Sequence, residues 1–144
     1  KRPDKPGPQM RGADDVCKLL RNAANADRES LYALHLDHQN RVVGVEEVAK
    51  GGIGSVEVRP PELFKAAILS NASAILLAHN HPSGSSEPSS ADLQMTRQII
   101  EAGKMLGIPV RDHVVVAADG CTSLRDRGLV MGFQGVARRK KRRR

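Results

Sequence analysis

Aromatic side chains are nearly absent from this 144-residue chain, which has no Trp, one Tyr and two Phe. The core must therefore be built from Leu, Ile, Val, Ala and Met. The same scarcity argues against recognition of bases or sugars by stacking, because few aromatic platforms exist for it.

Cysteines and long apolar runs are also scarce. Cys17 and Cys121 have neither the density of a secreted disulfide scaffold nor a C-x-x-C spacing. We therefore expect two reduced cysteines in a cytoplasmic protein, with no role as nucleophile or ligand. No apolar run of about 18 residues and no signal-peptide pattern occurs, so we expect no membrane contact.

Positive charge is concentrated at one end of the chain. Residues 138–144 read RRKKRRR, and without them 16 basic residues balance 16 acidic ones. We expect a flexible basic and Pro-rich segment over residues 1–13, one folded domain over 14–134 and a disordered basic tail over 135–144. The tail is either a solubilising extension or an arm with nonspecific affinity for nucleic acid.

Helix and strand patterns alternate along residues 14–134. Alternating apolar residues and turn signals predict a hairpin of strands 30–36 and 41–48, a further strand at 55–58, and a second hairpin of strands 110–117 and 121–124. An uninterrupted apolar run predicts a central strand over 72–78, buried on both faces. Apolar spacing and terminal Pro and Gly residues predict helices over 14–24, 60–71 and 89–107. This mixture predicts an α/β sandwich with a mixed sheet.

The last predicted helix carries a carboxylate on its apolar stripe. The stripe consists of Met95, Ile99, Ala102 and Leu106, and Asp92 falls on it three residues before Met95. A carboxylate at the end of a buried face needs a partner, because its desolvation without one is costly.

Two histidines end the predicted central strand. His79 and His81 are two residues apart, so both imidazoles project to the same side of an extended chain. Pro82 and Gly84 then turn the chain, which lets Asp92 supply a third ligand. Two imidazoles and a carboxylate favour zinc and leave a fourth position open. A plainer interpretation stays open: H-x-H occurs by chance, and Ser89 with Asp92 is also a helix capping box.

This motif and its surroundings resemble a known family. His79-Asn80-His81-Pro82 followed by Ser89-x-x-Asp92 resembles the JAMM metal motif of the JAB1/MPN domain, and HNHPSG with PSSAD resembles its bacterial RadC branch. The segments LHLDHQNRVVGVEEVAKG, RPPELFKAAILSNASAILLAHNHPSG and LGIPVRDHVVV are similar to RadC counterparts as well. The similarity covers roughly residues 28 to 130.

The resemblance implies a cytidine-deaminase-like three-layer α-β-α sandwich with a mixed sheet. It implies zinc bound by His79, His81 and Asp92, with Ser89 hydrogen-bonding near the metal water. It also implies a glutamate base on an early strand. Glu29 is our candidate, because it enters the first predicted strand, and Glu46 and Glu47 are its competitors.

The function implied is zinc-dependent hydrolysis of a peptide or isopeptide bond in a protein substrate. Two alternatives remain open: a DNA-associated metal-dependent hydrolase or nuclease, in keeping with the association of the family with DNA repair, and a non-catalytic MPN interaction module. His113 also resembles a recurring element of the family, and we interpret it as a hydrogen-bonded structural histidine. His35 and His38 are interpreted as strand and turn residues.

Overall fold

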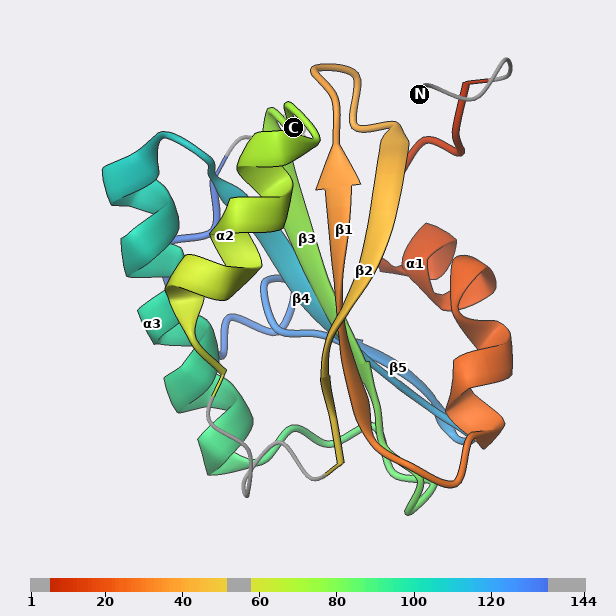
Figure 1. Cartoon of the computed structure of the whole chain (residues 1–144). Coiled ribbons are helices and arrows are strands. Elements are labelled where there is room, and N and C mark those ends of the chain that lie inside the picture. Colours follow the sequence, from red (N-terminus) through yellow and green to blue (C-terminus); the bar gives the residue numbers. More distant parts are fainter. Residues whose placement is uncertain (1–5, 52–57, 135–144) are drawn as a thin grey trace, which may run out of the picture.

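Five strands form one mixed sheet at the centre of the protein (Figure 1). The structure is a computed structural model, and it describes residues 6–51 and 58–134. The strands lie in the order β2-β1-β3-β4-β5. Among the strands in these two ranges, β3 and β4 run parallel, and the other neighbouring strands are antiparallel. The strand bounds are β1 Ser30–Leu36, β2 Val42–Lys50, β3 Ala74–Asn80, β4 Val110–Ala117 and β5 Gly120–Ser123.

Helices cover both faces of this sheet. The helices α2 (Pro60–Leu69) and α3 (Ser90–Leu106) lie on one face, and α1 (Ala13–Leu19) lies on the other with the short 3-10 helix η1 (Arg21–Asn25) after it (Figure 1). Two separate apolar clusters match this arrangement, one between the sheet and α2 and α3, the other between the sheet and α1. The predicted α/β sandwich of three layers with a mixed sheet is therefore confirmed.

The central strand β3 separates the two apolar clusters. All seven of its residues are buried, as the apolar run predicted. Ile75 and Leu77 belong to the cluster under α2 and α3, whereas Leu76 and Ala78 belong to the cluster under α1. Because successive side chains of a strand alternate between faces, odd-numbered residues of β3 face α2 and α3. The connection from β3 to its parallel neighbour β4 runs through α3, as parallel strands require a crossover.

The ends of α2 and α3 follow their sequence signals. Pro60 stands in the first turn of α2, and Asn71 adopts a positive φ of 58° just after it. Ser89 caps the start of α3, and Gly107 ends it with a φ of 73°. A residue in this left-handed conformation ends a helix because it supplies hydrogen bonds to the last carbonyls. The predicted helices over 60–71 and 89–107 are confirmed, as are both hairpins.

Two details of the predicted helices are wrong. Leu106 lies 51% exposed although the predicted stripe places it in the core, because within residues 6–51 and 58–134 no element covers the last turn of α3 on that side. The predicted helix over 14–24 is α-helical only to Leu19, since Leu20 leaves helical geometry with φ of −108° and ψ of 18°. Val16 is the buried residue of α1, and Leu19 is 38% exposed.

The expectation of two unpaired cysteines is also wrong. Cys17 on α1 and Cys121 on β5 are joined as a disulfide, with their Cα atoms 6.3 Å apart. The two residues are 104 positions apart in the sequence. No local spacing signals such a pairing, because only the packing of α1 against β5 brings the two side chains together.

Three expectations fall partly or wholly outside the described residues. The predicted strand over 55–58 lies outside them except for Val58, and the predicted flexible segment over 1–13 lies outside them in residues 1–5. The predicted basic tail over 135–144 lies outside them completely. Within the ranges that are described, the helices are too short or too polar to cross a bilayer.

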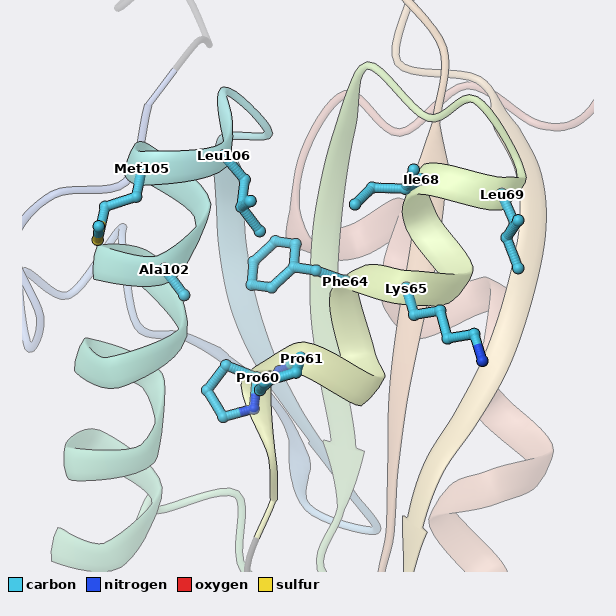
Figure 2. A pocket seen from close by; sticks show the side chains of 9 residues that line it. All are labelled: Pro60, Pro61, Phe64, Lys65, Ile68, Leu69, Ala102, Met105 and Leu106. Carbon is cyan, nitrogen blue, oxygen red and sulfur yellow. The ribbon is translucent and has the colours of Figure 1, made fainter.

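An apolar groove of about 470 Å³ lies between α2 and α3 (Figure 2). Phe64 forms its floor, and Lys65 is its charged lining residue; the other lining residues are Pro60, Pro61, Ile68, Leu69, Ala102, Met105 and Leu106. Leu106, in the last turn of α3, lines this open groove, and its side chain is therefore exposed.

Gly103 lies where α3 comes closest to the chain that follows it. A Cβ atom at this position would lie 2.5 Å from the carbonyl oxygen of Ile108 and 3.2 Å from Cζ of Phe64. In most helices a change from Gly to Ala stabilises the fold by about 1 kcal/mol. Here the backbone oxygen cannot move without displacing β4, so α3 requires glycine at this position.

We predict that Gly103→Ala lowers the free energy of unfolding by about 1–2 kcal/mol, because overpacking outweighs the gain in helix propensity. Denaturant unfolding followed by circular dichroism measures it. The exposed position Gln98 on the same helix gives the control, since Gln98→Ala should change stability by less than about 0.5 kcal/mol. A stabilised Gly103→Ala protein would contradict the close packing of α3 against Ile108.

Candidate metal centre

The end of β3 presents two histidines to the same face of the sheet. His79 is an odd-numbered residue of β3, so its side chain lies on the side of α2 and α3. His81 follows the strand and continues its geometry, since its backbone N–H donates to the carbonyl of Val116 on β4 at 3.0 Å. Gly84, with a φ of 93°, then turns the chain away toward α3.

Asp92 reaches the histidines from the first turn of α3. It is 1% exposed, and it forms a complete capping box with Ser89. The backbone N–H of Asp92 donates to Ser89 Oγ at 3.1 Å, and the backbone N–H of Ser89 donates to Asp92 Oδ2 at 2.8 Å. The capping interpretation of these two residues is thus correct, and it does not compete with convergence on the histidines.

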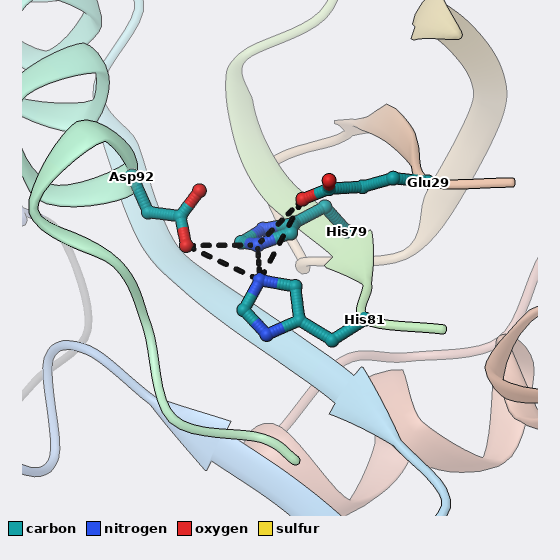
Figure 3. Close-up of side chains that lie close together, drawn as sticks. All are labelled: Glu29, His79, His81 and Asp92. Carbon is teal, nitrogen blue, oxygen red and sulfur yellow. Dashed lines mark hydrogen bonds and ion pairs between the residues drawn. The ribbon is translucent and has the colours of Figure 1, made fainter. Parts of the chain in front are cut away.

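Three donor atoms converge at a spacing suited to one metal ion (Figure 3). His79 Nε2 lies 2.8 Å from His81 Nε2, and Asp92 Oδ2 lies 3.2 Å from each of them. Ligands about 2.0–2.1 Å from a tetrahedral zinc ion lie about 3.3 Å from one another. The two imidazoles and the carboxylate therefore have the chemistry and nearly the spacing of a zinc ligand set.

Glu29 lies beside these three atoms but farther away. Its Oε1 is 3.6 Å from His81 Nε2 and 3.9 Å from His79 Nε2. The antiparallel pairing of Leu31 with His79 explains this position. Glu29 lies two residues before Leu31, and His81 lies two residues after His79, so the two come opposite each other. All four side chains offer a ligand atom within 4.8 Å of one another, so the cluster could hold a metal ion.

The two competing glutamates on β2 lie elsewhere. Glu46 Oε2 is 3.7 Å from Nε2 of His35, and Glu47 Oε1 accepts a 3.5 Å hydrogen bond from the Ser30 hydroxyl. Neither belongs to the cluster of four ligand atoms. Of the three candidate bases, the fold brings only Glu29 to the histidines.

The histidines determine the charge state of Asp92. Burial opposes its ionisation, but hydrogen bonds from His79 and His81 outweigh burial and hold the pKa of the Asp92 carboxyl well below its usual range. In turn, the hydrogen bond with Asp92 raises the pKa of His81 against the effect of burial. A carboxylate that stays ionised beside imidazoles is ready to accept a cation.

Hydrogen bonds behind the site orient both imidazole rings. His79 Nδ1 lies 2.6 Å from His113 Nε2, and His113 Nδ1 lies 2.5 Å from Oγ1 of Thr96. The Thr96 hydroxyl donates to the carbonyl oxygen of Asp92 at 2.7 Å. His81 Nδ1 lies 3.0 Å from the carbonyl oxygen of Ser85, which can only accept.

These contacts define a single consistent pattern of protons. If Nδ1 of His79 donates to His113, then Nδ1 of His113 donates to Thr96. The Nε2 atoms of His79 and His81 then carry the protons that face Asp92, and the loss of those protons would free both lone pairs for a metal. Burial lowers the pKa of His113, so its ring is neutral as the pattern requires. His113 is hydrogen-bonded, as interpreted, and one of its partners is the candidate ligand His79. Thr96 was missed, although its position four residues after Asp92 on α3 could have indicated it.

Access to the site is from the side of Glu29 and His81. Their side chains are 23% and 14% exposed, whereas that of His79 is fully buried. Ser89 is also exposed at the start of α3. A substrate could therefore reach Glu29, His81 and Ser89 without displacing core residues.

The chain is similar to proteins from several bacteria. A family model described as RadC-like JAB domain matches residues 10–129. A UPF0758 protein of Desulforamulus reducens is 41% identical over 122 residues, covering 84% of this chain and 54% of the relative. UPF0758 proteins of Salinibacter ruber and Desulforudis audaxviator are 43% and 41% identical and cover 82% and 89% of this chain.

The chain spans about half the length of these curated relatives, from 49% to 56%. The resemblance of the sequence to the RadC branch is confirmed by the family model, which covers the whole region from α1 to β5. With this coverage and relatives at 41–43% identity, the chain belongs to the RadC-like JAB domain family.

Proposed function

We propose that this domain is a zinc-dependent hydrolase of the JAMM type that cleaves a peptide or isopeptide bond. The observation that carries the proposal is the convergence of His79 Nε2, His81 Nε2 and Asp92 Oδ2 within 3.2 Å of one another, with Glu29 Oε1 just outside them. Three protein ligands and an accessible carboxylate beside them are typical of catalytic rather than structural zinc sites.

The donor set supports zinc. Neutral imidazole nitrogens and one carboxylate oxygen form a borderline set, whereas magnesium and calcium prefer oxygen ligands alone. When bound, zinc supplies Lewis acidity and lowers the pKa of a coordinated water molecule toward about 7.

Glu29 is proposed as the proton carrier. Its carboxylate takes a proton from the attacking water as the new C–O bond forms at the carbonyl carbon. It then gives that proton to the leaving nitrogen as the C–N bond breaks. A distance of 3.6 Å to His81 Nε2 keeps Glu29 near the reaction without using it as a ligand.

Ser89 is proposed to stabilise the developing oxyanion. Its Oγ accepts the hydrogen bond from the Asp92 backbone, which leaves the hydroxyl proton free to donate outward. Donors of this kind contribute a few kcal/mol to catalysis in favourable cases, roughly a hundredfold or more in rate. The capping role and the proposed catalytic role therefore use different parts of the same hydroxyl.

We predict one zinc ion per chain after reconstitution with excess zinc and removal of unbound metal. His81→Ala should reduce the content to near zero, because two ligands cannot hold zinc firmly. Elemental analysis by mass spectrometry measures it. His38→Ala, which alters an exposed histidine in the β1–β2 turn, is the control and should bind zinc normally. Full zinc content in His81→Ala would exclude His81 as a ligand.

We predict that Glu29→Gln keeps its zinc but loses at least about a hundredfold in kcat, because the amide cannot carry the proton. A peptide and isopeptide library, with products identified by mass spectrometry, measures it. Glu47→Gln is the matched control and should keep full activity. Unchanged turnover in Glu29→Gln would place the base elsewhere.

The same measurement, repeated with single- and double-stranded DNA as substrates, separates the alternative functions. Cleavage of single- or double-stranded DNA, with no peptide cleavage, would favour a nuclease. Stable zinc binding with neither activity would favour a non-catalytic interaction module. Either result contradicts the proposed peptidase while leaving the metal centre intact.

We predict that Thr96→Val weakens zinc binding about tenfold, because it breaks the hydrogen-bond chain that orients His79 through His113. Thr96→Ser keeps the hydroxyl and should retain the wild-type affinity. Competition with a chromogenic chelator measures both values. Equal affinities for the two variants would show that the chain through His113 does not act on the metal.

A further inference from the structure

Asn80 stands between the two histidines but belongs to the other face of the sheet. It is the last residue of β3, and side chains alternate along a strand, so its amide is directed away from the Nε2 atoms of His79 and His81. The residue is only 1% exposed. A buried amide at this position must be explained by its hydrogen-bond partners, because burial without them is costly.

The partners of the Asn80 amide lie on both sides of Glu29. Its Oδ1 accepts a 2.7 Å hydrogen bond from the backbone N–H of Ser30. Its Nδ2 donates to the carbonyl oxygen of Arg28 at 2.8 Å. One side chain thus holds the two peptide units that flank the proposed base.

This contact fixes the chain at the point where it enters β1. Glu29 precedes β1, and its own carbonyl oxygen accepts a 2.8 Å hydrogen bond from the backbone N–H of Gly51. Within residues 6–51 and 58–134, the Glu29 carboxylate has only the two longer contacts with His79 and His81, at 3.9 and 3.6 Å. Its position therefore depends on the backbone that Asn80 and Gly51 hold.

We propose that Asn80 is a positioning residue, which clamps the backbone on both sides of Glu29 and so sets its carboxylate beside the metal ligands rather than among them. This inference rests on the proposed function for the role of Glu29 as base. A displacement of a reacting group by about 1 Å can cost a hundredfold in rate, so the clamp matters to catalysis although Asn80 touches no substrate.

The test compares Asn80→Ala with a control that removes a different buried hydrogen bond. Ser123 on β5 is 5% exposed and donates to Asp112, and β3 and β4 separate β5 from β1, so Ser123→Ala removes a buried hydrogen bond without touching the chain around Glu29. We expect Asn80→Ala to keep one zinc per chain, to lose about a hundredfold in kcat and to expose the Ser30 amide to rapid hydrogen exchange. Ser123→Ala should keep its kcat and the protection of Ser30.

A double variant distinguishes positioning from a general structural role. Asn80→Ala added to Glu29→Gln should cause no further loss of kcat, because both changes remove the same contribution. The proposal would be overturned if the double variant lost kcat by the product of the two single losses. A normal kcat in Asn80→Ala would overturn it as well.

A second readout does not depend on hydrolysis. In cobalt-substituted protein, Glu29→Gln and Asn80→Ala should change the visible absorption bands in the same way, whereas Ser123→Ala should not. If the wild type cleaves no peptide, the peptidase proposal fails, but the clamp can still be tested. The same spectral change in Glu29→Gln and Asn80→Ala would support the clamp, and an unchanged spectrum in Asn80→Ala would overturn it. Should Asn80→Ala not fold, Asn80→Ser, which can reach only one of the two backbone groups, is measured in the same way.

Discussion

The antiparallel register of β1 against β3 is the constraint on which the candidate site depends. Leu31 pairs with His79, so the chain before β1 comes opposite the chain after β3, and Glu29 meets His81 there. A shift of one residue would turn both histidines to the face covered by α1. The apolar residues of β3 prevent such a shift, because each belongs to one of the two core clusters.

Asp92 joins the packing of α3 to the chemistry of the site. Its Oδ2 accepts the capping hydrogen bond from Ser89 and also faces both histidines. One carboxylate therefore both caps the start of α3 and directs an oxygen atom at the two histidines. The parallel step from β3 to β4 makes this possible, because its crossover brings the beginning of α3 to the end of β3.

Local patterns predicted the strands of both hairpins, the central strand, the two long helices and the grouping of His79, His81 and Asp92, because periodicity, caps and motif spacing are properties of neighbouring residues. Glu29 was indicated only by the resemblance to the RadC branch. The predictions failed where tertiary contacts decide. Leu106 follows the helical stripe but is not covered by any element in the described part of the chain, and Cys17 meets Cys121 only through the fold. Thr96 and Asn80 look like ordinary helix and strand residues, and their roles are visible only once His113 and Arg28 are placed beside them.

The pairing of Cys17 with Cys121 has a consequence for how the protein opens. Val16 is the fully buried residue of α1, and Ala13 and Cys17 pack partly buried against the same cluster, so the covalent link to β5 adds to a thin apolar layer. Reduction would make α1 and the chain around it the first unit to exchange and to admit proteases. The layer on the side of the candidate metal site, with its larger core under α2 and α3, would keep its native arrangement during that local opening.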